Sequence, residues 1–355
     1  MARPRPRPRA PRGARHRDPP QRLAPGRGLA PGRARGLRAG QPGRRRHLAH
    51  GGHGRRRRRG ARRGAGGRRV SPRVGVGLDA QYADEYPGGL VGFCAGLRPA
   101  LSHLSIVSLR SEEEAHAFRR DCAGPLPIVH HLSAVAPADP GGPDLRRFAE
   151  LDGISRALGA LWSCEDVGIW SLGPRALPYF TAPLLSREGV EHVAAGVREM
   201  LRRGSVPFAA ENPSFTIAAG ELSLGAYFRA LASRTGCDLV ADLSHVYSYA
   251  LCSGADPLAV ADAFPMEPVV ELHVAGGRVS EEDPRRYVDS HSDPILPEVL
   301  ELVERVAARA PRLRAVTYEI GVGLDREAIE RDLARIEAAL ERAGWAPRLR
   351  EGARG

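Results

Sequence analysis

Acidic and imidazole side chains, which are common ligands of metal ions in proteins, follow a series of short apolar runs between residues 120 and 320. Each stands where a run ends, as His130 does after PLPIV and His273 after PVVEL. The carboxyl ends of parallel barrel strands meet on one face, so these side chains would converge there. Two carboxylates about 4 Å apart repel by roughly 4 kcal/mol at an effective dielectric of about 20, and bound cations relieve that repulsion. The sequence therefore predicts a multinuclear metal site with the ligands His130, Asp166, Glu211, Asp242, His245, His273, Asp289, His291 and Glu319.

Two pairs of these residues have spacings that suit a shared ion. Asp289 and His291 are two residues apart, so an extended segment would point both to the same side. Asp242 and His245 are three apart, which fits a strand end that turns into a loop or a first helical turn. Either pair alone is as typical of ordinary polar residues at strand ends. The recurrence after each of the later strands favours metal binding.

Two positions need a choice between neighbours, because successive residues of a strand point to opposite faces. We favour His130 over His131, since His130 directly continues its apolar run, and we leave His131 as a supporting or loop residue. We favour Asp166 as the ligand over Glu165, which we expect to orient it or a neighbour.

The chain contains a single asparagine, Asn212, directly after Glu211, and its position indicates a role for its amide in the site. Imidazole and carboxylate ligands without thiolates suit iron, manganese or zinc rather than copper(I). We expect Glu211, Asn212, Asp242 and His245 to act in the reaction itself.

The elements that must position these residues follow from the alternation of strand-like and helix-like patterns after residue 73. Eight strand candidates separated by helical stretches imply a parallel sheet, and eight strands close a (β/α)8 TIM barrel. An open doubly wound sheet is less favoured, because no Gly-x-Gly-x-x-Gly follows the first strand. The predicted strands span 74–79, 102–109, 126–132, 160–166, 206–211, 238–242, 268–274 and 314–319, and the predicted helices 144–160, 187–203, 223–235, 294–309 and 325–344.

The first 70 residues differ in composition from the rest. They contain 24 Arg and one acid, about +23, while the whole chain carries +12, so the remainder carries about −11. We expect a disordered basic tail over residues 1–72, a catalytic barrel over 73–346 and a short disordered tail over 347–355. An over-extended start, with translation beginning near Val70, is favoured over a nucleic-acid-binding arm, since the tail has no aromatic residue to stack on bases.

Five cysteines without a Cys-x-x-Cys pair favour a reduced, cytoplasmic compartment. No apolar run approaches the roughly 18 residues that span a bilayer, so no membrane partner is expected. The loop Pro174–Pro183 brings Tyr179 and Phe180, which would form either a wall over the barrel mouth or a packed rim.

Several strings, in order and spacing, resemble the multinuclear non-heme iron-dependent oxidase family, which is similar to the methanobactin-synthesis oxidase and has a xylose-isomerase-like TIM barrel. They are AAENPSF (209–215), TGCDLVADLSHVY (235–247), VVELHVAGG (269–277), VDSHSDPI (288–295) and TYEIG (317–321). Two positions depart from the family pattern. Asp166 stands where an imidazole is usual, and His245 stands where an amide is usual.

The resemblance implies an enzyme that binds two or three iron ions and uses dioxygen to modify a ribosomally made precursor peptide, commonly at cysteine. It also implies a partner protein that delivers the peptide. The alternatives are a trinuclear zinc phosphodiesterase of the endonuclease IV type, a sugar-isomerase-like metalloenzyme, and a non-catalytic metal- or peptide-binding barrel. The acidic body disfavours a nucleic-acid substrate.

Overall fold

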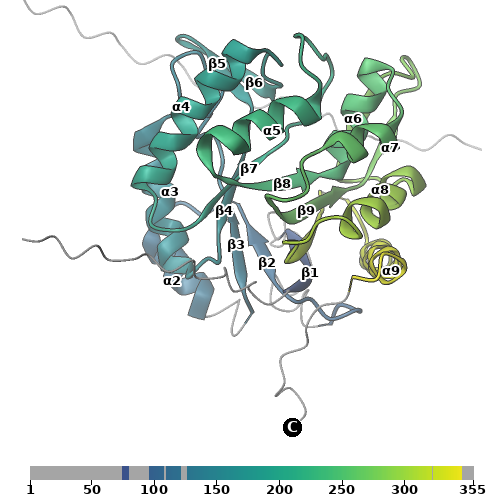
Figure 1. Ribbon diagram of the computed structural model, residues 1–355. Coiled ribbons are helices and arrows are strands. Elements are labelled where there is room, and N and C mark those ends of the chain that lie inside the picture. The colour runs from purple at the N-terminus through teal and green to yellow at the C-terminus, as the bar shows by residue number, and fades with distance from the viewer. Residues whose placement is uncertain (1–73, 80–95, 108, 121–125, 322, 346–355) are drawn as a thin grey trace, which may run out of the picture. The chain divides into compact units, whose positions relative to one another are not determined.

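The computed structural model describes residues 74–79, 96–107, 109–120, 126–321 and 323–345, in which parallel strands close into a barrel (Figure 1). Neighbouring strands are hydrogen-bonded in the order β1-β12-β9-β8-β7-β4-β3-β2, and β2 pairs with β1 to complete the circle. The predicted TIM barrel is thus confirmed, and all eight predicted strands form; the tails 1–72 and 347–355 lie outside the described residues. The barrel strands are β1 (Gly75–Asp79), β2 (Leu104–Ile106), β3 (Ile128–His131), β4 (Ser163–Asp166), β7 (Phe208–Glu211), β8 (Asp238–Asp242), β9 (Val269–Ala275) and β12 (Ala315–Glu319).

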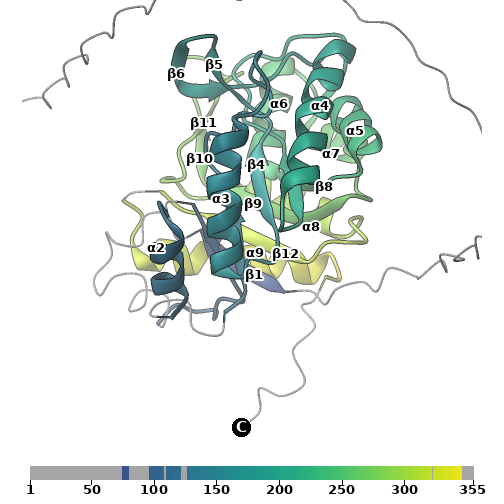
Figure 2. The ribbon, with the colours of Figure 1, turned by 90° about the vertical axis from the view of Figure 1, so that its left-hand side faces the viewer.

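Helices surround the barrel and cover the outer faces of its strands (Figures 1 and 2). The five predicted helices correspond to α3, α4, α5, α8 and α9, whereas α2, α6 and α7 were not predicted. Several begin after a Ser or Asp whose side chain accepts a hydrogen bond from the first turn, as Ser186 does from Gly189. The helices are α2 (Glu112–Phe118), α3 (Leu145–Leu158), α4 (Arg187–Arg203), α5 (Leu224–Thr235), α6 (Leu243–Ser253), α7 (Pro257–Ala263), α8 (Pro297–Ala307) and α9 (Arg326–Arg342).

The apolar residues form two layers, because each barrel strand alternates between the interior and the helices. The larger layer lies between strands and helices and includes the stripe of α9, with Ile329, Leu333 and Ile336 fully buried. The smaller layer fills the barrel interior and contains Val129, Trp162, Cys164, Ala209, Val240, Val270 and Ala315. In β3, β4, β7 and β8 a histidine or an acidic residue stands two positions after a residue that faces the barrel interior. Its side chain therefore also faces inward, at the carboxyl end of the barrel.

Two antiparallel hairpins stand outside the barrel, β5 (Ile169–Leu172) with β6 (Arg175–Thr181), and β10 (Gly277–Val279) with β11 (Tyr287–Asp289). The first follows β4, so it projects from the end where the barrel strands finish (Figure 2). The Asp139 carboxylate holds β5 by accepting hydrogen bonds from the backbone N–H groups of Trp170 (2.6 Å) and Ser171 (3.0 Å). Within the described part of the chain, no helix is both long and apolar enough to span a membrane.

Candidate metal centre

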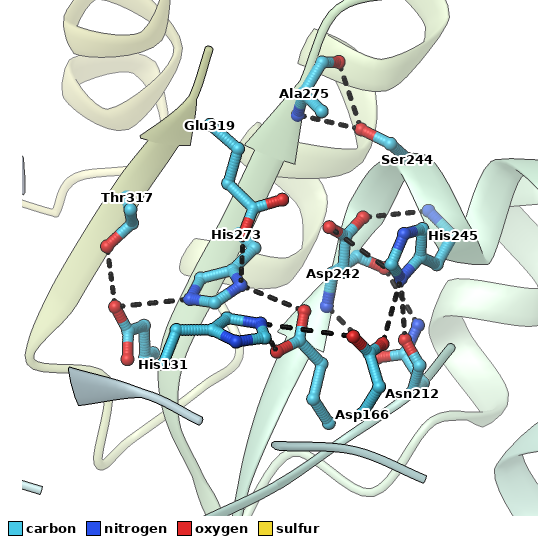
Figure 3. Close-up of polar contacts among 12 residues, drawn as sticks. His131, Asp166, Asn212, Asp242, Ser244, His245, His273, Ala275, Thr317 and Glu319 are labelled. Atoms are coloured by element: carbon cyan, nitrogen blue, oxygen red, sulfur yellow. Dashed lines mark hydrogen bonds and ion pairs between the residues drawn. The ribbon is translucent and has the colours of Figure 1, made fainter. Parts of the chain in front are cut away.

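Side chains from six barrel strands and from the segments that follow two of them meet at the carboxyl end of the barrel (Figure 3). The predicted spacing of Asp242 and His245 is explained by helix α6, which begins directly after β8. The Asp242 carboxylate caps this helix and accepts a hydrogen bond from the His245 backbone N–H (2.7 Å). The first turn of α6 thereby places the His245 ring in the same mouth as the strand-end carboxylates.

One group of possible ligands consists of His131, Glu211, His273 and Glu319, whose donor atoms lie within 4.8 Å of one another. The two oxygens of Glu211 approach different rings, Oε1 at 2.8 Å from His273 Nδ1 and Oε2 at 3.1 Å from His131 Nε2. Glu319 Oε1 lies 3.1 Å from the same His273 Nδ1. The two imidazoles are stacked, with ring centroids 5.6 Å apart. This arrangement is a compact set of two nitrogen and two carboxylate donors.

A second group consists of Asp166, Glu211 and His245, again within 4.8 Å. Asp289 Oδ2 lies 2.8 Å from His245 Nε2, and Asp166 Oδ1 lies 3.9 Å from His245 Nδ1. Glu211 belongs to both groups, so its carboxylate stands between them. Two adjacent cation positions that share Glu211 are therefore compatible with this geometry.

His291 lies beside both groups. Its Nε2 is 3.5 Å from Asp289 Oδ1 and 3.7 Å from Glu319 Oε2. Its backbone φ of 55° is left-handed rather than extended, so the predicted extended Asp289-x-His291 segment does not form at His291. The two side chains nevertheless come together, because the chain is tied on both sides of the mouth. The His291 N–H donates to Gly276 O (2.9 Å), and its carbonyl accepts from Gly321 N–H (2.6 Å).

Protonation in this crowded cluster is far from ordinary. Burial and the charge of Glu211 raise the pKa of Asp166 well above its usual value, and burial with the nearby Glu319 carboxylate raises the pKa of Asp242 to about 7. Burial opposes charging of His291, but the adjacent Asp289 carboxylate raises its pKa to about 10. The protein without cations therefore keeps extra protons here. Cations would take the place of those protons.

Unpartnered oxygen atoms provide a separate test of whether the residues suit a metal. Asp166 Oδ1, Glu211 Oε2, Asp242 Oδ2 and Asp289 Oδ1 are buried and accept no hydrogen bond from any described residue. Glu211 Oε2 is close to His131, yet without hydrogen-bond geometry. Buried carboxylate oxygens without a donor are costly unless a cation approaches them. Four of them in one mouth, beside imidazole nitrogens, fit a multinuclear metal centre.

A cavity of about 150 Å³ opens over the cluster, and the β5–β6 hairpin forms one of its walls. Trp170, Tyr179 and Phe180 line it, with the Tyr179 and Phe180 rings stacked at 4.5 Å. Of the two interpretations left open for this segment, the wall over the mouth agrees with the structure, although strand β6 forms most of it rather than a loop. A neighbouring hollow of about 440 Å³ is also lined by residues of the hairpin, and Trp170 lines both.

The structure places His131, not His130, in the cluster, so the sequence-based choice between them was wrong. Val129 faces the barrel interior, and alternation along β3 then sends His130 outward and His131 inward. His130 is fully buried against α3, where its Nδ1 lies 2.6 Å from Ser155 Oγ. The other eight predicted ligands do lie at the mouth.

Asn212 does not point its amide at the cluster. Its Nδ2 donates to Asp242 O (2.9 Å) and its Oδ1 accepts from Asp242 N–H (3.0 Å), so the amide binds both backbone groups of the last residue of β8. Its own carbonyl lies 2.7 Å from His245 Nδ1. Asn212 therefore positions Asp242 and His245, and the predicted direct part in the reaction has no support from this geometry.

Glu271 was missed by the sequence reading. It is fully buried in β9 and shares the interior face with Ala315 and Val240, its partners on the neighbouring strands. Its Oε1 lies 3.4 Å from His273 Nε2. The spacing of two residues from His273 on a buried strand was a signal that could have identified it.

Comparison with known proteins agrees with this geometry. A sequence model described as "RiPP precursor modification enzyme MbnB/TglH/ChrH" matches residues 109–338. A UPF0276 protein of Streptomyces avermitilis is 28% identical over 233 residues, which cover 61% of this chain and 46% of that protein. A UPF0276 protein of Rhizobium meliloti is 34% identical over 185 residues, 47% of this chain and 57% of that protein. The chain thus spans about half the length of these relatives.

Among solved structures, a xylose isomerase domain containing protein from Salmonella typhimurium has a TM-score of 0.52 at 12% identity and covers 78% of this chain and 100% of that one. At this identity the likeness shows a shared xylose-isomerase-like barrel and nothing about the reaction. The family match covers well over half of the chain and includes all nine residues at the barrel mouth, from His131 to Glu319. The chain belongs to the MbnB/TglH/ChrH family of RiPP precursor modification enzymes.

Proposed function

We propose that this chain binds two or three iron ions and uses dioxygen to oxidise a ribosomally made precursor peptide at cysteine side chains. The observation that carries the proposal is Glu211, whose carboxylate stands between two groups of donor atoms. Carboxylates shared between two cations are typical of two-metal catalytic sites. Membership in a family of peptide-modifying enzymes supports the substrate class. Zinc or manganese suits the same donors and is the alternative content.

The ligands divide naturally between two positions. His131, His273 and Glu319 would hold one ion with Glu211, and Asp166 and His245 would hold a second. Asp242, Asp289 and His291 lie at the second position or between the two, where a third ion would find its donors. When bound, iron would supply the redox chemistry with dioxygen that cysteine oxidation needs.

The chain's own side chains would bind and shield the peptide. Partial desolvation of the hydroxyl at the cavity and the charge of Asp166 raise the pKa of Tyr179, although much of its ring is exposed, so it stays a neutral hydrogen-bond donor beside the cavity. Trp170 and Phe180 supply apolar surface that keeps water from the reacting side chain. Leu172 and Tyr179 on the hairpin are 54% and 57% exposed, so their apolar surface would be accessible to a bound peptide.

The shape of the mouth suits an extended substrate better than a small sugar. The cavity over the cluster has room for one side chain, and the larger hollow beyond Trp170 has room for neighbouring residues of the same peptide. The described residues that line this cavity include no arginine that could hold a phosphodiester backbone, which disfavours the zinc nuclease. We further propose that a partner protein helps deliver the peptide, as the sequence resemblance implies.

The test is metal analysis of protein purified without oxygen, followed by oxygen-uptake measurements. We expect at least two iron ions per chain, and oxygen uptake that requires a Cys-containing precursor peptide encoded beside the gene, with its partner protein present. A peptide with Cys replaced by Ser is the control and should give no uptake. Zinc content with cleavage of abasic DNA would instead establish the nuclease. Absence of bound transition metal would refute both.

A further inference from the structure

Glu271 lies within the barrel, below the proposed ligands, and two hydrogen-bond donors and an imidazole nitrogen surround it. Trp162 Nε1–H donates to Oε2 (2.5 Å), and the Thr317 hydroxyl donates to Oε1 (2.5 Å). The third neighbour is His273 Nε2, 3.4 Å from Oε1. The carboxylate has no exposed surface, and a buried charge of this kind persists when its oxygens are hydrogen-bonded. Its surroundings are therefore built for a carboxylate.

The two nitrogens of His273 face different environments. Nδ1 faces Glu211 and Glu319 at the mouth, at 2.8 and 3.1 Å. Nε2 faces downward to Glu271 and has no hydrogen-bonding partner of good geometry among the described residues. An imidazole that gives its Nδ1 lone pair to a cation must carry its proton on Nε2. Glu271 is the carboxylate placed to accept a hydrogen bond from this Nε2–H.

A second chain of hydrogen bonds holds Glu271 from the opposite side. Since Thr317 gives its hydroxyl proton to Glu271, its oxygen accepts from His103 Nε2 at 2.9 Å. His103 Nδ1 then lies 3.0 Å from the Ser102 hydroxyl. Gly77 is required here, because a Cβ on it would lie 2.3 Å from the His103 ring. The Thr317 hydroxyl is thus oriented toward Glu271, while the Ser102 hydroxyl at the far end of the chain donates to Val76 O (2.6 Å).

A third metal position at this place has less support. Cys164, Glu271 and His273 bring donor atoms within 4.8 Å. However, both oxygens of Glu271 already accept hydrogen bonds from Trp162 and Thr317. The group is better suited to support a ligand than to bind an ion.

We propose that Glu271 is a positioning residue that accepts a hydrogen bond from His273 Nε2–H and thereby aims Nδ1 at the metal. The inference rests on the proposed metal site. Carboxylates that orient ligating histidines in this way raise the basicity of the ring and fix its tautomer, and their loss typically costs roughly 10- to 100-fold in metal affinity. Because Glu271 lies outside the cavity, it does not touch the substrate.

The test compares Glu271→Gln with Asp332→Asn, a matched control at a second buried carboxylate. Asp332 accepts hydrogen bonds from Ile295 N–H (3.1 Å) and the Tyr318 hydroxyl (3.2 Å), on the helix side of the barrel. We expect Glu271→Gln to weaken anaerobic Fe²⁺ binding roughly 10- to 100-fold at one of the bound ions. Asp332→Asn should lower the unfolding temperature of the metal-free protein and leave Fe²⁺ affinity unchanged.

A tautomer measurement separates positioning from general stability. In Zn²⁺-loaded protein labelled with ¹⁵N-histidine, the wild type should carry the His273 proton on Nε2, and Glu271→Gln should disturb that signal. Unchanged Fe²⁺ affinity together with an unchanged His273 signal would overturn the positioning role alone, whereas a wild type that binds no metal would overturn the proposed function as well. If Glu271→Gln does not fold, Glu271→Asp must show the same loss in milder form.

Discussion

The neighbouring histidines His130 and His131 provide a sharp test of the site, because one change at each position has opposite expected effects. Asparagine can replace the Nδ1 side of an imidazole but not the Nε2 side. His130 contacts Ser155 through Nδ1 at 2.6 Å, whereas His131 contacts Glu211 through Nε2 at 3.1 Å. His130→Asn should therefore keep its contact, and His131→Asn should lose it.

The magnitudes follow from these contacts. In His130→Asn the hydrogen bond is retained, and the small cavity left by the ring costs roughly 1–2 kcal/mol, which lowers the unfolding temperature by about 2–8 °C. In His131→Asn a charge interaction of gross size about 5 kcal/mol, at 3.1 Å and an effective dielectric of about 20, disappears from the metal-free protein. The cost of desolvating the charged ring offsets much of this interaction in the metal-free protein, so the larger expected effect is on metal binding. Loss of a ligand should weaken binding by at least the roughly 10- to 100-fold that loss of a supporting residue costs.

The assay is iron content after anaerobic loading, measured beside thermal unfolding of the metal-free proteins. We expect His130→Asn to bind iron as the wild type does and to unfold at a lower temperature. We expect His131→Asn to lose at least one ion per chain. Iron loss in His130→Asn with full loading of His131→Asn would refute the assignment of the inward-facing histidine.

Three further outcomes are expected. The metal-free protein should lose stability as pH rises from about 5 to 10. Folding raises the pKa of Asp242 to about 7 and that of His291 to about 10, so each group stabilises the fold below its unfolded-state pKa and loses this contribution as pH rises through its folded-state pKa. Thermal unfolding at several pH values measures this loss. Removing metal with a chelator should lower the unfolding temperature, and more so at higher pH, where a deprotonated site binds cations best. Calorimetry with and without Fe²⁺ measures this difference, and equal unfolding temperatures would contradict metal binding. Tyr179→Ala should raise KM for the peptide several-fold at unchanged iron content, and a lower iron content would place Tyr179 in the metal site instead.

The barrel was predictable because its signals are local. Each of the eight strands is a short apolar run, and the helices between them carry periodic apolar stripes such as Ile329, Leu333 and Ile336 in α9. Helix α6 was not predicted because nearly all of its first turns are buried, so it lacks the polar face that identifies a helix. The hairpin β5–β6 was read as a loop since Pro174 and Pro178 interrupt its alternation.

The site was predictable as a set but not in its details. The meeting of the candidate ligands at the strand ends follows from topology, which brings all those ends together. The choice between His130 and His131 depends on which face of β3 turns inward, and in IVHH both faces present an apolar residue followed by a histidine. The interior position of Glu271 depends on a register irregularity between β8 and β9 near Val270, which a periodic reading of one strand does not contain.

The two departures from the family pattern acquire a physical explanation when their positions are compared. Asp166 stands in place of an imidazole and His245 in place of an amide, and in the sequence they are 79 positions apart. In the structure Asp166 Oδ1 lies 3.9 Å from the His245 ring, and the two residues belong to one group of possible ligands. His245 Nδ1 faces the Asn212 carbonyl at 2.7 Å, so Nε2 is the nitrogen available to an ion. In the proposed site, α6 would thus supply the imidazole that is absent from β4, and the number of nitrogen donors around that ion would be kept. In that proposed site, the negative charge of Asp166 beside Glu211 would raise the affinity of the group for a cation and would stabilise the more highly charged state of a redox-active ion.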